Sequence, residues 1–413
     1  MSEIKQGYKQ TKVGIIPEDW EDIKIKDIVK VSQGLQIAID DRFTTPAHNR
    51  VFYITIPFIE GKKEEYIENP KSSTLCKKDD ILVVRTGSGV GKIIRGVEGA
   101  FHNNFFKVKP SDNINIDFFY YFLTSPRVQF LMAKYAGNSA IPDLNHGDFY
   151  SLDFLIPPLK EQEKIAEILT TWDEAITKQT ELLRAKELQK KALMQKLLSG
   201  EVRFNGFNDV WQEIRLDKLV FFQEGPGVRN TQYRKSGVKL LNVGNLNNNI
   251  LNLSSTETYI SEEEAYGVYK HFLVDEGDLL ISCSGINSES FKKKIAFVKK
   301  EHLPLCMNTS TMRFKNLKNK LLLEYLYFFF QTLFFEKQVF GVLTGSAQFN
   351  FGPTHIKWFK IKLPSLPEQQ KIAEVLSLAD DEINLLKNEL EELKLQKKAL
   401  MQKLLTGEVR VKV

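Results

Sequence analysis

The sequence predicts a mixed α/β (α+β) fold, in which two globular domains are joined by two long antiparallel coiled-coil helices with pseudo-twofold symmetry. Three observations predict it. The chain has 413 residues, which suits two domains with connecting elements better than one core. The stretch LQKKALMQKLL occurs twice, at 188–198 and 395–405. Apolar residues in both copies follow a period of about 3.5 residues, as in coiled coils.

The repeat extends well beyond this stretch. Residues 157–204 align with 364–411 without a gap, and 27 of the 48 pairs are identical. WEDIKIKDIVKVSQG at 20–34 resembles WQEIRLDKLVFFQEG at 211–225, and DDILVVRTGSG at 79–89 resembles GDLLISCSGI at 277–286. A fixed offset of this kind indicates an internal duplication. The chain is therefore interpreted as two units, each a variable domain followed by a nearly constant helix.

The ends of the constant segments carry helix signals. Prolines precede each one, early glutamates follow, and Gly200 or Gly407 stands where a C-terminal cap is expected. The predicted organisation is a first domain at 1–157, a helix at 158–199, a second domain at 200–364, a helix at 365–406, and a tail at 407–413 that returns near the N-terminus.

The apolar seam of each helix is expected to pack on the seam of the other. Each helix is about 39 residues long, or roughly 58 Å at 1.5 Å per residue. The first helix delivers the chain to the second domain without a long linker, so the two should run antiparallel. Polar residues interrupt the frame at Gln179, Lys186, Lys190 and Lys397. The predicted seam consists of Ile165, Leu169, Trp172, Ile176, Leu183, Leu193, Leu197, Ile372, Leu376, Ala379, Ile383, Leu386, Leu390, Leu393, Leu400 and Leu404.

Composition bounds the class of protein. The net charge of +5 is compatible with a polyanionic partner but is too small to indicate one. No secretory signal is recognised at the N-terminus, and the most apolar run, 321–335, is interrupted by Glu324 and Gln331 and too short for a bilayer. The three cysteines form no CxxC pair, which suits a reducing compartment. We expect a cytoplasmic protein without a membrane segment.

Catalytic motifs are missing from the sequence. TGSGVGKI at 86–93 fails the spacing of a phosphate-binding loop, and Ile93 stands where a magnesium-binding hydroxyl would be needed. The six histidines form no HExxH and have no cysteine at metal-ligand spacing. No aminomethyltransferase motif and no nuclease cluster is found. The chain is therefore predicted to be non-catalytic, with no metal and no cofactor of its own.

A rigid spacer between two divergent domains suggests that two different readers are held at a fixed distance. Double-stranded DNA is a natural object for such a device, because its helical turn of about 34–36 Å sets the spacing of paired recognition elements. The alternative is a non-enzymatic coiled-coil scaffold that presents two protein-binding domains. A self-contained DNA enzyme is a third possibility, which the missing motifs disfavour.

Three features resemble the specificity subunit of type I restriction–modification enzymes. They are GYKQTKVGIIPEDW at 7–20, the helix starts PPLKEQEKIAEIL and PSLPEQQKIAEVL, and the helix ends LLSGEVR and LLTGEVR. The resemblance covers essentially the whole chain. It implies two target-recognition domains that read a split DNA sequence, and helices that set the unread gap. It also implies two methylation subunits as partners, to which restriction–translocation subunits can be added, with S-adenosylmethionine bound by the methylation subunit.

Candidate DNA contacts follow from the side chains that direct base readout requires, namely Arg, Lys, Asn, Gln, Ser and Thr. The aromatic stretches 118–123 and 325–330, at the same offset, are instead expected to be core helix. In the first domain the candidates are Arg85, Thr86, Ser88, Lys92, Asn103, Asn104 and Asn138. In the second domain they are Arg229, Asn245, Asn247, Ser282, Ser284, Asn308, Thr309, Ser346 and Gln348.

Overall fold

The computed structural model describes residues 4–87, 89–137, 139–285, 287, 291–317, 319–342 and 350–413. Contacts divide the chain into two compact units, and the division cuts both long helices. Unit 1 comprises residues 1–181 and 388–413, and unit 2 comprises residues 182–387. Each unit thus holds one domain, the first half of the helix that follows it, and the last half of the other helix.

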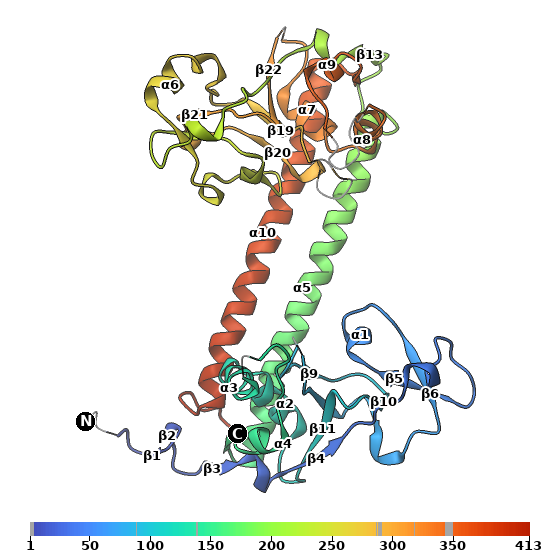
Figure 1. Ribbon diagram of the computed structural model, residues 1–413, viewed down its shortest axis with the longest axis vertical. Coiled ribbons are helices and arrows are strands. Elements are labelled where there is room, and N and C mark those ends of the chain that lie inside the picture. Colours follow the sequence, from blue (N-terminus) through green and yellow to red (C-terminus); the bar gives the residue numbers. More distant parts are fainter. Residues whose placement is uncertain are drawn as a thin grey trace. The chain divides into compact units, whose positions relative to one another are not determined.

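Unit 1 is built on two four-stranded sheets (Figure 1). The first is antiparallel in the order β4 (Val29–Gln33), β11 (Phe105–Pro110), β8 (Ile81–Val84), β9 (Ile93–Ile94). The second has the order β6 (Glu65–Glu68), β5 (Arg50–Ile54), β10 (Gly99–Phe101), β7 (Leu75–Cys76), with β5 and β10 parallel. Two short pairs complete the strands: β1 (Tyr8–Thr11) with β2 (Gly14–Pro17), and β3 (Glu21–Lys24) with β12 (Asp153–Ile156).

Short helices lie between these strands. They are α1 (Ile56–Ile59), α2 (Ile116–Thr124), α3 (Pro126–Ala136) and α4 (His146–Tyr150). Side chains cap three of them: Asn115 accepts from the first backbone amides of α2, Ser125 from α3, and Asn145 from α4. The α4 cap matters most for function, because it fixes the start of this helix beside the end of β8.

Unit 2 repeats the first sheet in the order β14 (Val220–Glu224), β22 (Thr311–Asn316), β19 (Leu279–Ser282), β20 (Ile295–Phe297). Its second sheet is smaller, with β18 (Tyr259–Ile260), β15 (Val238–Leu240) and β21 (Leu305–Cys306). The remaining pairs are β13 (Gln212–Arg215) with β23 (Lys360–Leu363) and β16 (Leu246–Asn247) with β17 (Ile250–Leu251). Its short helices are α6 (Glu262–Tyr266), α7 (Leu323–Phe329), α8 (Leu333–Phe340) and α9 (Pro353–Ile356).

The two long helices are α5 (Leu159–Ser199) and α10 (Leu366–Leu405). Both end one residue or two before a glycine in the left-handed region, Gly200 at φ +76° and Gly407 at φ +71°, so the predicted C-terminal caps are confirmed. In unit 1, Asp173 pairs with Lys397 and Gln179 contacts Glu389. Since the partner's number falls as the first number rises, the helices run antiparallel there.

The same direction holds within unit 2. Lys186 pairs with Glu382 at 2.6 Å and Lys190 with Asp380 at 2.5 Å. The antiparallel arrangement expected from connectivity is therefore present in each unit. All sixteen residues of the predicted seam are buried or half-buried.

Two of the polar breaks in the seam occupy equivalent positions and make the same contact. Lys190 bonds Asp380 and lies 5.4 Å from the ring centre of Phe328, and Lys397 bonds Asp173 and lies 5.2 Å from the ring centre of Tyr121. Each lysine thus forms an ion pair with the other long helix and lies over an aromatic ring. Only unit 1 adds a hydroxyl, which Tyr121 donates to Asp173 at 2.8 Å.

A buried carboxylate joins each helix start to the tail of the other repeat. Glu161, with 0% of its surface exposed, accepts hydrogen bonds from the Trp20 indole and from Arg410 at 2.7 Å. Glu368, also 0% exposed, accepts from the Trp211 indole and from Arg203 at 2.8 Å. The GEVR tail of each copy thus bonds the EQ helix start of the other copy.

The main core of each unit includes both long helices. The core of unit 1 contains Ile165 and Leu169 of α5 with Leu404 of α10, and the core of unit 2 contains Leu197 of α5 with Leu376 of α10. The aromatic stretches 118–123 and 325–330 lie in α2 and α7, and most of their rings are buried in these cores. Their prediction as core helices is confirmed. None of the helices in the described ranges is apolar over a length that could cross a bilayer.

Candidate nucleic-acid interface

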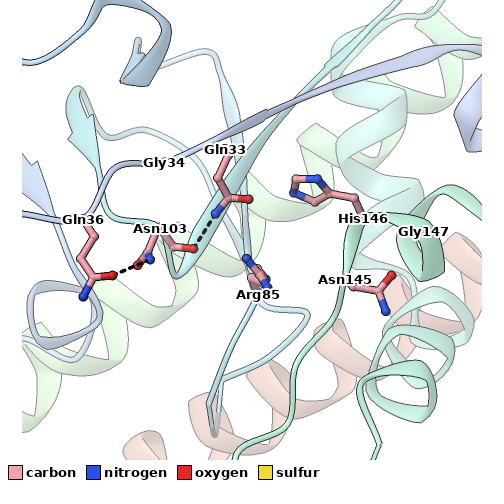
Figure 2. A pocket seen from close by; sticks show the side chains of 8 residues that line it. All are labelled: Gln33, Gly34, Gln36, Arg85, Asn103, Asn145, His146 and Gly147. Carbon is pink, nitrogen blue, oxygen red and sulfur yellow. Dashed lines mark hydrogen bonds between the residues drawn. The ribbon is translucent and has the colours of Figure 1, made fainter.

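Unit 1 carries a polar cleft of about 590 Å³ at the end of its antiparallel sheet. The end of β4, the end of β8, the turn before β11 and the start of α4 meet there. Figure 2 shows Gln33, Gln36 and Asn103 on one side of Arg85, and Asn145 and His146 on the other. Its lining residues are Gln33, Gly34, Gln36, Arg85, Asn103, Asn145, His146 and Gly147.

A glycine allows two backbone segments to meet beneath the cleft. A Cβ atom at Gly34 would lie 2.3 Å from the carbonyl oxygen of His102, so no other residue fits without displacing backbone. The adjoining Asn103 amide donates to the carbonyl of Leu35 at 3.0 Å. This crossing fixes the positions of the side chains that follow it.

Amide side chains form a short chain of hydrogen bonds along one wall (Figure 2). The Gln33 side chain donates to the carbonyl of Asn103 at 2.8 Å, and the Asn103 side chain donates to Gln36 Oε1 at 3.0 Å. These bonds orient the three amides, while Gln36 remains exposed at the rim. The arrangement leaves donors and acceptors facing the cleft on preoriented side chains.

Arg85 holds the centre of the cleft. Its guanidinium makes two hydrogen bonds with Asp143, at 2.9 and 3.2 Å, and its backbone carbonyl accepts from Leu144 at 2.9 Å. The side chain is about one-third exposed. Asp143 therefore fixes the orientation of the guanidinium and leaves part of it open to a ligand, as suits recognition by a fork of N–H donors.

His146 lines the opposite wall. Its ring packs edge-on against Phe106, with centres 5.2 Å apart, and its buried Nε2 has no hydrogen-bond partner among the described residues. Burial, and then repulsion from Arg85, lowers the pKa of His146. The ring is accordingly neutral at pH 7, and its Nε2 is enclosed in this conformation.

The chemistry of this cleft matches that of base recognition. Arginine bonds the major-groove edge of guanine, and asparagine or glutamine bonds that of adenine, each through two hydrogen bonds. The cleft is lined by one guanidinium and four side-chain amides, of which the Asn145 amide is bonded to Asp148 as the cap of α4. Among the described residues no group of three histidine, cysteine or acidic side chains could hold a metal ion.

Unit 2 has the same backbone frame at this place. The Thr309 amide donates to the carbonyl of Pro226 at 2.9 Å, as Asn103 does to Leu35, and the Phe351 amide donates to Cys283 at 3.0 Å, as Leu144 does to Arg85. A Cβ atom at Gly225 would lie 2.1 Å from the carbonyl oxygen of Asn308. These correspondences place Cys283 where unit 1 has Arg85.

The side chains on this shared frame differ. Glu224 takes the place of Gln33, since both close the strand that pairs with the central strand. Cys283 is buried, and burial, followed by the nearby Glu224 carboxylate, raises the pKa of its thiol. Unit 2 thus replaces an exposed donor by a buried thiol and an amide by an acceptor-only carboxylate.

The candidate DNA contacts of unit 1 fall into two groups. Arg85 and Asn103 line the cleft, whereas Thr86 and Asn104 are half-buried next to them and Lys92 is exposed at the far end of the β8–β9 loop. Thr86 forms an isolated strand bridge with Asp143. Ser88 and Asn138 lie outside the described residues.

The candidates in unit 2 are more scattered. Thr309, Arg229 and Asn247 are exposed, and Ser284 is half-buried. Ser282 and Asn308 are buried at the shared frame. Ser346 and Gln348 lie outside the described residues.

Asn245 differs from the expectation for a base contact. Its side chain is 0% exposed and donates to Asn252, Ser255 and Thr256. Its amide closes the turn before β16, so in this conformation it offers no atom to a base. Asn245 was predicted to contact DNA because it is a polar residue in a loop, and its burial could not be seen from the sequence.

Sequence reasoning missed Gln33, Gln36, Asn145 and His146. The sequence did contain a signal for Gln33, because the repeated strand segment ends in SQG at 32–34 and in QEG at 223–225. An unchanged glycine at the end of two diverging strands indicates a close backbone approach. No local pattern marked Asn145 and His146, which lie at the start of α4, more than 100 residues along the chain from Gln33 and Gln36.

Comparison with protein families and curated proteins gives two kinds of match. The family model of the type I restriction modification DNA specificity domain matches residues 17–185 and again 208–395. The specificity subunit of the type I restriction enzyme MjaVIII from Methanocaldococcus jannaschii is 25% identical over 425 residues, covering 99% of this chain and 97% of that protein. The MjaIX specificity subunit of the same organism is 24% identical over 432 residues, covering 98% and 96%.

Solved structures share the fold. The S subunit of a type I restriction–modification system from M. genitalium matches with a TM-score of 0.54 at 17% identity, covering 94% of this chain and 96% of that one. A structure solved to explain complex assembly and conformational transition of the type I R-M system matches with a TM-score of 0.59 at 15% identity, covering 95% and 99%. At these identities the matches establish fold.

Proposed function

Since this chain belongs to the family of type I restriction modification DNA specificity domains, we propose that it selects the DNA sequence on which a type I restriction–modification enzyme acts. Its target-recognition domains, residues 1–157 and 200–364, each read one half of a bipartite site. The helices set the number of unread base pairs between the halves. The chain supplies recognition and no catalysis.

One observation carries this proposal. The same backbone frame occurs in both units, but it presents Arg85 in unit 1 and Cys283 in unit 2. Duplicated frames with different side chains suit two half-sites of different sequence. A cleft lined by a guanidinium and amides supports DNA as the ligand, because these groups pair with base edges in the major groove.

A second observation supports two copies of one partner. Leu188 and Leu395, equivalent residues in the repeated LQKKALMQKLL, are 59% and 64% exposed. Packing between the helices does not require identity at exposed positions. Identical exposed leucines on the two helices therefore suit a methylation subunit that docks twice.

The cofactor of methylation, S-adenosylmethionine, belongs in this proposal to the methylation subunits. No nucleotide or methyltransferase motif was found in the sequence, and the polar cleft of unit 1 is lined by side chains suited to base recognition. The protein works in the cytoplasm, and its three cysteines are free and buried, as suits a reducing compartment. Restriction–translocation subunits can join the assembly.

Binding to DNA tests the first half of the proposal. The chain, mixed with methylation subunits, is incubated with a duplex library, and methylated adenines are mapped by sequencing. We expect one bipartite sequence to be methylated, and gel shifts to show tighter binding to it than to scrambled duplexes. Methylation without any shared sequence would favour the scaffold alternative instead.

Stoichiometry tests the second half. We expect native mass spectrometry to show one specificity chain with two methylation subunits. Leu188→Glu or Leu395→Glu should each leave one methylation subunit bound, and the double variant none. The matched control is Leu385→Glu, because Leu385 is 58% exposed but has lysine at the equivalent position of the other helix. Retention of two partners by the double variant would contradict the proposed docking site.

A further inference from the structure

Unit 2 contains a second large cleft, of about 750 Å³, that the proposed base contacts do not use. It lies between the last half of α5, the first half of α10, the β16–β17 hairpin and the segment that leads into β20. Its distinctive residues are Lys191 of α5, Asn249 of the hairpin and Lys293 before β20.

The cleft is positively charged. Five lysines and two acidic residues line it, a net charge of +3. Three of the lysines, Lys190, Lys292 and Lys387, are held in ion pairs. The side chains of Lys191 and Lys293 are exposed and make no ion pair or hydrogen bond within the part of the chain that the structure describes. Their charges are therefore available to an anion.

The hairpin gives the cleft a fixed wall. Asn248 and Asn249 adopt the left-handed conformation, with φ of 50° and 60°, as a two-residue hairpin turn requires. The Asn249 amide donates to the carbonyl of Lys293 at 2.8 Å, and its side chain donates to Gln331. Asn249 Oδ1 is buried without a partner among the described residues.

The cleft adjoins the part of unit 2 around Cys283, which corresponds to the polar cleft of unit 1. Lys292 and Lys293 follow Cys283 and Ser284 on the same β19–β20 connection, at the edge of the sheet where Cys283 lies. Its helical wall, from Glu187 to Lys191 and from Asp380 to Lys387, belongs to the halves of α5 and α10 that lie within unit 2. A DNA duplex bound beside Cys283 would therefore bring its backbone past Lys292 and Lys293.

We propose that this cleft binds the sugar–phosphate backbone of the unread DNA beside the half-site of unit 2, an inference that rests on the proposed function. Lysines contact phosphates as point charges and carry no sequence information. Such contacts suit the segment between two half-sites, whose sequence is not selected.

Among the described residues of unit 1, the position of Lys293 is occupied by Gly91. The Val84 amide donates to the carbonyl of Lys92 as the Ser282 amide does to the carbonyl of Lys294, so the residues that precede these two lysines, Gly91 and Lys293, are equivalent. A Cβ atom at Gly91 would lie 3.2 Å from Met132, so the position is packed against α3. The backbone contact is accordingly one-sided, next to one half-site only.

Salt-dependent binding tests the proposal with the assembled complex of this chain and methylation subunits. The probes are its mapped target duplex and a duplex of scrambled sequence. Lys191→Glu/Lys293→Glu should weaken binding to both duplexes about tenfold and lower the slope of log K against log salt by about 2, since each phosphate contributes about 0.9. The methylated positions should not change. Phosphate ethylation interference should detect spacer contacts beside one half-site and lose them in this variant.

The control is Lys337→Glu, an exposed lysine on α8 that does not line the cleft. If the double variant binds like this control, or loses affinity for the target duplex alone, the proposal is wrong although the proposed function stands. Loss of a methylation subunit would identify the cleft as a protein contact and overturn it as well. A wild-type complex without sequence preference would instead refute the proposed function. Lys191→Gln/Lys293→Gln, which also removes both phosphate contacts, should lower the slope by a similar amount.

Discussion

Two pairs of equivalent regions have diverged to very different degrees: the surroundings of Arg85 and Cys283, and the starts of the two long helices. In the first pair the backbone hydrogen bonds correspond, but Cys283 in unit 2 replaces Arg85 of unit 1, and Glu224 replaces Gln33. At the helix starts even the side-chain contacts are the same, with Trp20 and Trp211 bonding Glu161 and Glu368. Positions that face a variable ligand have changed, and positions that close the fold have not.

The tie at the helix starts should give the largest effects. Glu161→Gln and Glu368→Gln each weaken a buried, charge-assisted network, so each should lower the free energy of unfolding of its unit by about 3 kcal/mol. Urea denaturation followed by fluorescence of Trp20 or Trp211, with the other tryptophans replaced by phenylalanine, would report on each unit. Glu163→Gln, an exposed neighbour, is the control and should change less than about 0.5 kcal/mol. Unequal losses in the two units would break the equivalence.

Substitution of Arg85 and of its equivalent Cys283 should change DNA affinity unequally. Arg85→Ala should weaken binding of the assembled complex to its target by about 10- to 100-fold, because a lost bidentate base contact costs about 1–3 kcal/mol. It should also relax selectivity within one half-site. Cys283→Ala at the equivalent position should change affinity less than about threefold, since the buried thiol offers no group to DNA. Competition gel shifts with single-base variants of the target measure both, and equal losses would contradict the inequality.

Acid should destabilise unit 1 through a residue that unit 2 lacks. Burial, and then repulsion from Arg42, lowers the pKa of His102 to about 4, and its neutral Nδ1 accepts from the Asn104 amide. Since the folded pKa lies below the unfolded value near 6.5, the contribution is complete above pH 6.5 and is lost as the pH falls toward 4, by at most about 3 kcal/mol.

Asn308 occupies the equivalent position in unit 2 and does not titrate. His102→Asn should therefore remove this part of the acid sensitivity from unit 1. Urea unfolding between pH 7 and pH 4, compared for the wild type and this variant, tests the expectation. Identical pH profiles would show that His102 is not the responsible group.

The cross-helix ion pairs should show the smallest difference. Lys190→Met leaves Asp380 without its lysine, whereas Lys397→Met leaves Asp173 with the Tyr121 hydroxyl. The first variant should therefore be less stable than the second by about 1 kcal/mol. Adding Tyr121→Phe, which copies Phe328 of unit 2, should abolish the difference. Thermal unfolding of the three variants provides the measurement.

Much of the fold could be predicted because it is encoded in local periodicity and in the repeat. The seam frame and the capping glycines Gly200 and Gly407 indicated two long helices, and connectivity required them to run antiparallel. The lysine breaks at positions 190 and 397 could be located but not explained. Their partners, Asp380 and Asp173, lie about 200 residues away along the chain, so the contact becomes visible only when the helices pack.

The candidate site was predicted less completely, for a related reason. Arg85 and Asn103 flank strands that the sequence pattern revealed, and both line the cleft. His146 and Asn145 start a five-residue helix whose position depends on tertiary packing. Asn245 shows the converse, because a loop asparagine can be spent entirely on the backbone of its own turn.

The exchange of GEVR tails has a consequence for the order in which the protein can fold during synthesis. The domain made first needs Arg410 for Glu161, and the carbonyl of Gly407 for the Tyr8 hydroxyl, from residues that are made after the whole of the second domain. In the domain made second, Arg203 can bond Glu368 as soon as Glu368 has been translated. The amino-terminal domain can therefore complete this contact only after the second domain has been made, and a chain truncated before Arg410 would lack it.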